Sequence, residues 1–118
     1  MSKFLTGFRF ARAGVRYLFK SQLNAKVQLA IALLVIAAGF VLGIRQIEWC
    51  AIVLCMVAVF ALEAANTAIE LLADAVHPDQ HPLVGKAKDV AAGAVLIAAT
   101  GAAIVGAIIF LPYLGIRL

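Results

Sequence analysis

The sequence contains few charged residues: only 14% are Asp, Glu, Lys or Arg, against about 25% in soluble domains. Its hydrophobic fraction is 65%, whereas about 45–50% is usual. A soluble domain of 118 residues has too much surface to cover with so few charges. The composition therefore excludes a soluble globular domain and predicts a single-domain membrane protein.

Cysteine is also rare, and the two cysteines, Cys50 and Cys55, lie in one apolar run. A separation of five residues turns two helical side chains about 140° apart, so the pair is badly placed for a disulfide. We interpret both as small apolar side chains.

The common nucleotide-binding motifs are missing as well. There is no GxxxxGK[ST] sequence and no GxGxxG after a strand, so any ATP site would be built from helix faces and loop charges. The N-terminal segment carries bases throughout and has no continuous apolar core, which is not typical of a cleaved signal peptide.

Long apolar runs take the place of the missing charge. We predict an all-α membrane protein with transmembrane helices over about residues 26–44, 47–76 and 87–113. Residues 77–89, HPDQHPLVGKAKD, are expected to form a turn-rich connection. Gly39 and Gly43 form a GxxxG pattern, and small residues recur in the third span; both favour close helix packing and an oligomer.

The N-terminal segment, about residues 4–21, has apolar side chains at helical spacing and bases at other positions. This pattern predicts an amphipathic helix in the membrane interface, with a plain cytoplasmic tail as the alternative. Because these bases adjoin membrane segments, anionic headgroups are the expected partner, and nucleic acid is not.

The distribution of bases predicts the orientation. Six bases precede the apolar run that begins at Val27, and Lys86 and Lys88 follow the second span, whereas Arg45 and Arg117 belong to the opposite side. The positive-inside rule then places the N-terminus and residues 77–89 in the cytoplasm and the C-terminus outside, in a multi-pass protein of the cytoplasmic membrane.

The second span ends in the polar stretch EAANTAIELLAD, residues 63–74. At 100° per residue, its polar side chains fall in one stripe about 100° wide; they are Glu63, Asn66, Thr67, Glu70 and Asp74. Acids are costly in lipid, so the stripe is expected to face a shared polar cavity. It could hold a divalent cation, act as a general base or carry protons. Pairing with Lys86 and Lys88 for assembly alone is the structural alternative.

The residues after the second span allow two interpretations each. Lys88, beside Asp89, could bind a transferring phosphoryl group or anchor a helix end at the interface. His77 and His81 could be metal ligands, but their place among prolines favours exposed turn residues.

The stretch from Glu63 to Asp74 resembles the signature E-x-x-N-[ST]-[SA]-[LIV]-E-x-x-V-D of the prokaryotic diacylglycerol kinase and undecaprenol kinase family. Only Ala73, in place of valine, departs from it. HPLVGKAKDVAAGAVLIAA is similar to the family's second block, with Lys88 and Asp89 as its K-D pair. Phe8, Ala11 and Gly14 match its N-terminal FxxAxxG pattern.

The resemblance implies a small membrane kinase that works as a homotrimer of three-span subunits, each with a surface helix and with sites shared between subunits. It implies that Glu63 is the base that takes the proton of the lipid hydroxyl. Glu70 would hold Mg²⁺ on the ATP phosphates, with Asn66 orienting this group. Lys88 would contact the phosphates, and Asp89 and Asp74 would support the polar cluster. The residues expected to bind ATP are Arg9, Arg16, Glu70, Asp74 and Lys88.

One departure bears on the metal. Family members often have glutamate, a second metal ligand, where Gln22 stands; an amide oxygen can still bind Mg²⁺ but carries no charge. Gln28 occupies a position that is acidic in one branch of the family. Asn24 and the HPL at residues 81–83 are more similar to the undecaprenol kinase branch, which favours undecaprenol over diacylglycerol as the lipid alcohol.

Two hypotheses from other classes stay open. A small proton-coupled multidrug transporter would use an intramembrane glutamate for substrate and proton in turn. A non-enzymatic assembly factor would use the acid stripe only to bind partners.

Overall fold

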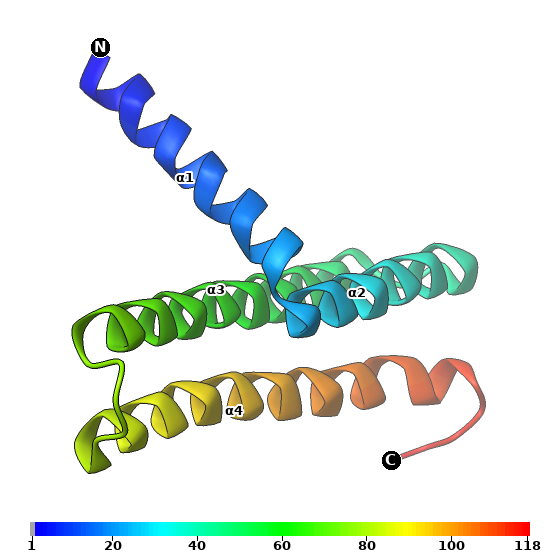
Figure 1. Cartoon of the computed structure of the whole chain (residues 1–118). Helices are drawn as coiled ribbons and strands as arrows, with labels where there is room; N and C mark the ends of the chain where they lie inside the picture. The colour runs from blue at the N-terminus through cyan, green and yellow to red at the C-terminus, as the bar shows by residue number, and fades with distance from the viewer. Residues whose placement is uncertain (1) are drawn as a thin grey trace.

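The computed structural model describes residues 2–118, and every regular element in this range is a helix. The helices are α1 (Ser2–Ser21), α2 (Leu23–Leu42), α3 (Gln46–Val76) and α4 (Pro82–Tyr113) (Figure 1). The last three are long and apolar enough to cross a membrane. The predicted all-α fold, with an N-terminal helix followed by three spans, is confirmed.

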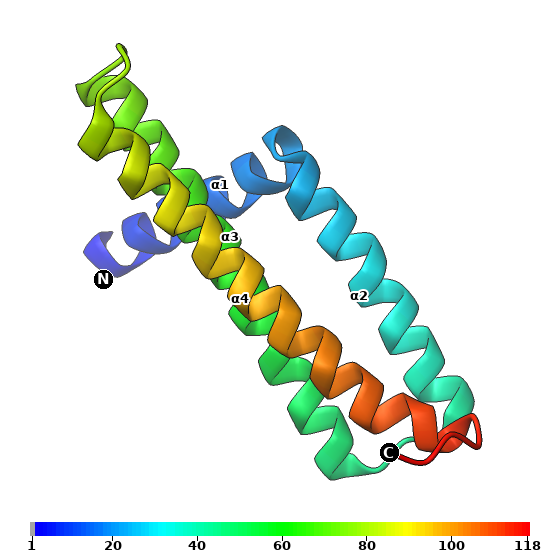
Figure 2. The same cartoon turned by 90° about the horizontal axis from the view of Figure 1, so that it is seen from below.

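α3 and α4 form an antiparallel pair with the most extensive interface in the molecule, and α2 runs alongside them (Figures 1 and 2). The α3–α4 connection lies at one end of the pair; the α2–α3 connection and the C-terminus lie at the other. α1 leaves the bundle at an angle. It is attached near its C-terminal end, where Leu18 is buried and the rings of Phe19 and Phe60 lie 5.5 Å apart.

Local sequence explains where α2 and α3 begin and end. Gln22 has extended backbone angles and separates α1 from α2. α2 stops at Gly43, whose φ of 63° is left-handed and suits a residue without a Cβ. α3 begins after Arg45, whose backbone N–H donates to Glu48 Oε1 at 2.9 Å. This bond satisfies one of the free donors at the helix start.

The expected connection over residues 77–89 is too long, because α4 already begins at Pro82. Proline is tolerated in the first turn of a helix, where its missing N–H would have no partner. His81 Nδ1 accepts a hydrogen bond from the backbone N–H of Leu83 at 3.1 Å and caps this start. Lys88 and Asp89 lie inside this helix, as the predicted span over residues 87–113 had them, but the helix starts earlier and the connection is confined to residues 77–81.

The two glycines of the GxxxG pattern have different structural roles. Gly39 packs against α3: an added Cβ there would lie 2.6 Å from Cη2 of Trp49. Gly43 ends the helix. The pattern thus serves packing and chain reversal within one chain.

Little of the apolar surface of the three long helices is covered by the chain itself. In their most hydrophobic stretches only 17%, 17% and 11% of residues are buried. This exposure suits helices surrounded by lipid or by further protein.

Candidate functional site

The acid stripe lies on the part of α3 that approaches the α3–α4 connection. Glu63 and Thr67 are 3% and 5% exposed, and they are the buried polar residues of the described chain. Thr67 Oγ1 donates to the backbone carbonyl of Glu63 at 2.9 Å. That bond leaves the Glu63 carboxylate free to act on something else.

Asn66 and Glu70 form the next pair of the stripe, one turn apart. Asn66 Nδ2 donates to Glu70 Oε1 at 3.4 Å. Asn66 Oδ1 is buried and has no hydrogen-bond partner among the described residues. A buried acceptor left unpaired costs about 1–3 kcal/mol, and such groups call for an explanation. A ligand that donates a hydrogen bond to Oδ1 would remove this cost.

Glu63 and Asn66 line a cavity of about 280 Å³, called here the polar pocket. α2 contributes Asn24, Val27 and Gln28, and α4 contributes small and aliphatic side chains. Three helices therefore converge on the carboxylate. The other side chains that line the pocket are neutral, so none of them forms an ion pair with the Glu63 carboxylate. The carboxylate can therefore take a proton from a ligand in the pocket.

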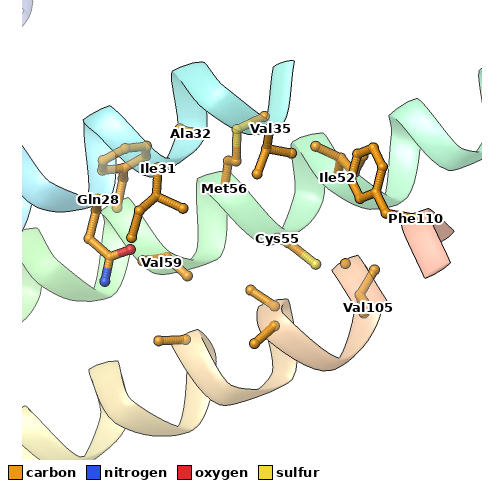
Figure 3. A pocket seen from close by; sticks show the side chains of 15 residues that line it. Gln28, Ile31, Ala32, Val35, Ile52, Cys55, Met56, Val59, Val105 and Phe110 are labelled. Atoms are coloured by element: carbon orange, nitrogen blue, oxygen red, sulfur yellow. The ribbon is translucent and has the colours of Figure 1, made fainter. Parts of the chain in front are cut away.

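A second cavity of about 320 Å³, the apolar pocket, runs between the same three helices toward the opposite end of the bundle. Its walls are aliphatic, aromatic and sulfur-containing apart from Gln28 (Figure 3). Gln28 and Ala99 line both pockets, so the apolar pocket adjoins the polar one at these residues. An elongated molecule with a polar head and an apolar body fits this arrangement.

Farther along the stripe, Lys88 Nζ donates to Asp74 Oδ1 at 2.7 Å and ties α4 to α3. Both side chains are substantially exposed, at 36% and 64%. Exposed ion pairs are worth about 0–1 kcal/mol, so Lys88 can leave Asp74 for a stronger anion at small cost. Both residues line a cavity of about 540 Å³ beside the α3–α4 connection, called here the loop pocket.

The histidines of the connection are engaged with the backbone. His77 Nδ1 lies 2.9 Å from the carbonyl oxygen of Asp79, and His81 caps α4. Their rings lie 4.9 Å apart, and both line the loop pocket. Among residues 2–118, no group of three or more His, Cys, Asp and Glu side chains is placed to hold a metal ion.

The structure does not join the remaining predicted site residues to this cluster. Asp89 is exposed, and Arg9 and Arg16 are exposed on α1, which points away from the bundle (Figure 1). Gln22 is hydrogen bonded through Nε2 to Ser21 Oγ at 3.4 Å. One chain therefore groups the residues of α3 with Lys88 and leaves these four apart.

Two residues that line the polar pocket, Asn24 and Gln28, were not among the predicted site residues. They lie four residues apart and so share one face of α2, a signal as readable as the stripe on α3. A polar contact at the far end of the bundle was also missed: the Tyr113 hydroxyl donates to Glu48 Oε1 at 2.5 Å and links the end of α4 to the start of α3. No pattern within one helix predicts that contact.

Comparison with known proteins gives consistent matches. Residues 9–110 match the family described as Prokaryotic diacylglycerol kinase. The chain is 38% identical over 114 residues to a protein of Bacillus subtilis named "Undecaprenol kinase", covering 97% of this chain and 93% of that protein. It is 41% identical over 109 residues to a "Diacylglycerol kinase" of Synechocystis, covering 92% and 62%. A "Diacylglycerol kinase" of Haemophilus influenzae is 29% identical over 98 residues, 83% of either chain.

These matches bear on the open hypotheses. The relatives are named as lipid kinases, under both of the names to which the sequence motifs point. The transporter hypothesis has no support among them.

Proposed function

Because the chain belongs to the prokaryotic diacylglycerol kinase family, a family of lipid kinases, we propose that it transfers the γ-phosphoryl group of ATP to the hydroxyl of a membrane lipid alcohol. Undecaprenol is the favoured substrate and diacylglycerol the second. The observation that carries the proposal is the position of Glu63, in a polar pocket that adjoins an apolar one at Gln28 and Ala99.

The two pockets suggest how a lipid is held. Its hydrocarbon would occupy the apolar pocket and its hydroxyl the polar pocket, within reach of Glu63 and Asn66. Glu63 would accept the hydroxyl proton while the oxygen attacks the γ-phosphorus and the bond to the β-phosphate oxygen breaks, which releases ADP. Asn66 would orient Glu70 through the hydrogen bond from its Nδ2 to Glu70 Oε1.

The phosphates would lie on the side of Glu63 nearer the α3–α4 connection. Along α3, Glu70 and Asp74 are about 10 Å and about 16 Å beyond Glu63, at 1.5 Å per residue. Lys88 faces Asp74 across the hairpin and can supply a positive charge to the phosphates. The loop pocket beside them has room for further parts of the nucleotide. Asp89 would support this cluster.

The predicted ligands offer Mg²⁺ one carboxylate, from Glu70, and one amide oxygen, from Gln22. The ion usually binds one or two protein carboxylates and takes its other ligands from phosphates and water. Glu70 supplies one such carboxylate, since only its Oε1 is engaged, weakly, with Asn66. Gln22 would be the second ligand through its amide oxygen, which requires it to turn from Ser21. Mg²⁺ would neutralise the charge on the ATP phosphates.

The charges favour one orientation in the cytoplasmic membrane. The bases of α1 and those near the start of α4 would face the cytoplasm, where ATP is present, and the C-terminus would lie outside. Lipid would enter sideways from the bilayer.

We further propose a homotrimer with sites shared between subunits. Arg9 and Arg16 line none of the three pockets of their own chain, so in an oligomer they would bind the ATP of a neighbouring site. Mixing chains that carry Glu63→Gln with chains that carry Arg9→Ala tests this. Shared sites predict that the mixture regains activity that neither variant has alone, and no recovery would argue for self-contained sites.

The first test of the function is phosphate transfer from labelled MgATP in mixed micelles that contain undecaprenol and diacylglycerol side by side. Labelled undecaprenol phosphate as the main product supports the favoured substrate, and labelled phosphatidic acid would reverse the order. Labelling of neither lipid, by protein shown to be folded and assembled, would count against the proposed function.

A further inference from the structure

Gln28 lies where the two pockets meet, and it differs from the rest of the apolar pocket's lining. Of the 15 side chains that line the apolar pocket, it alone carries nitrogen or oxygen. Figure 3 shows its amide at one end of the pocket, directed toward the space between the helices. The same residue lines the polar pocket together with Glu63 and Asn66.

The Gln28 amide forms no side-chain hydrogen bond with the part of the chain that the structure describes. None of the side-chain hydrogen bonds of residues 2–118 involves Gln28. Its side chain offers two N–H donors and a carbonyl acceptor. Water can bind these groups before a lipid does, because the residue is partly exposed. Once hydrocarbon fills the apolar pocket, that water is displaced, and an unpaired amide disfavours binding.

Resting on the proposed function, we infer that Gln28 determines lipid specificity, by donating a hydrogen bond to the ester carbonyl of a glycerolipid next to the reacting hydroxyl. A 1,2-diacylglycerol carries one ester on the carbon next to the one that bears the hydroxyl, and its second ester one carbon farther along. With that hydroxyl at Glu63, an ester would lie at the junction of the pockets, beside Gln28.

A polyprenol offers no such acceptor. Apart from its hydroxyl it is hydrocarbon, so its first isoprene unit would cover the Gln28 amide without pairing it. Gln28 thus lowers kcat/KM for a polyprenol relative to kcat/KM for diacylglycerol, whichever of the two lipids is phosphorylated faster.

Three lipids separate this role from a structural one: a 1,2-diacylglycerol, the matching 1,2-dialkylglycerol ether, and undecaprenol. The ether keeps the hydroxyl and both chains but has a methylene group in place of each carbonyl. kcat/KM is measured for each lipid with the wild type, Gln28→Met and Gln46→Met. Gln46 is exposed at the start of α3 and lines neither pocket, so it receives the same substitution as a matched control.

The wild type should favour the diacyl over the dialkyl lipid by about fivefold, the effect of one hydrogen bond of average strength. Gln28→Met should bring this ratio close to one and raise the ratio of undecaprenol to diacylglycerol by a similar factor. Gln46→Met should keep both wild-type ratios.

Three results would overturn the inference. They are a wild-type diacyl-to-dialkyl ratio near one, which needs no variant; an equal loss with all three lipids in Gln28→Met; and a wild type that phosphorylates undecaprenol but neither glycerolipid. If no lipid is phosphorylated at all, the proposed function has failed and the inference falls with it.

Discussion

Replacing Glu63 by glutamine removes the proposed base with little change in shape. The side chain keeps its length and stays in the polar pocket, but it can no longer accept a proton at neutral pH. The hydrogen bond from Thr67 ends on the backbone carbonyl of residue 63 and is not affected. A neutral amide is also easier to bury at 3% exposure than a carboxylate, so the helix should not be destabilised.

The size of the effect follows from the role. A positioned general base contributes about 10²–10⁴-fold to a rate, or about 2.7–5.4 kcal/mol of activation free energy. Glu63→Gln should therefore lower kcat by at least about a hundredfold. The KM for ATP should change by less than about threefold, because the proposed phosphate-binding groups on α3 lie about two to three turns away.

The assay is initial-rate transfer from labelled MgATP to lipid in mixed micelles, with the ATP and lipid concentrations varied separately. Glu48→Gln is the matched control: it makes the same change on the same helix, at the end far from the pocket, and an amide oxygen can still accept from Tyr113. Circular dichroism and size-exclusion chromatography establish that both variants keep the helix content and assembly of the wild type.

The reasoning is refuted if Glu63→Gln keeps a kcat within about threefold of wild type, less than any general base supplies. A fall in kcat accompanied by lost assembly would instead assign Glu63 a structural role. Glu48→Gln should retain wild-type turnover.

The remaining predictions concern nucleotide, packing and metal. Lys88→Met should raise the KM for ATP by about tenfold or more, because one charge-assisted hydrogen bond is lost. Thermal stability should change little, since the ion pair of Lys88 is exposed. An unchanged KM would leave Lys88 as an interfacial anchor. Gly39→Ala should lower the thermal midpoint in detergent, at a cost of about 1–3 kcal/mol, because the new Cβ meets the Trp49 ring; Gly93→Ala, with open space around it, is the control and should show no drop. Gln22→Glu should lower the Mg²⁺ concentration for half-maximal activity by about tenfold, since ligand charge tunes the affinity for hard cations; an unchanged titration would remove residue 22 from the ligand set.

Much of the site could be predicted because it lies on one helix. The positions of Glu63, Asn66 and Glu70 around α3 depend only on helical periodicity, which the sequence contains directly. The burial of Glu63 and the bond between Asn66 and Glu70 accord with that stripe. The apolar runs likewise predicted the three long helices, since crossing a bilayer requires both length and low polarity.

What depends on two helices at once could not be predicted in this way. The register of α2 against α3, which brings Asn24 and Gln28 to Glu63, is set by side-chain packing between elements. The tie between Lys88 and Asp74 depends on where α4 starts. That start was misplaced because Pro82 was interpreted as part of a turn, although proline suits the first turn of a helix.

The end of the bundle where we propose that the phosphates bind is open, and this links catalysis to assembly. Phosphoryl transfer needs neutralised charge and exclusion of water around the reacting group. One chain supplies Lys88 and a few acids there, largely exposed, while α1, whose bases are exposed, leaves its own bundle at an angle (Figure 1). A neighbouring chain that placed its α1 over this end would add positive charge and cover the phosphates together. Loss of assembly would then look like loss of a catalytic group, so each substitution in the stripe has to be judged at matched oligomeric state.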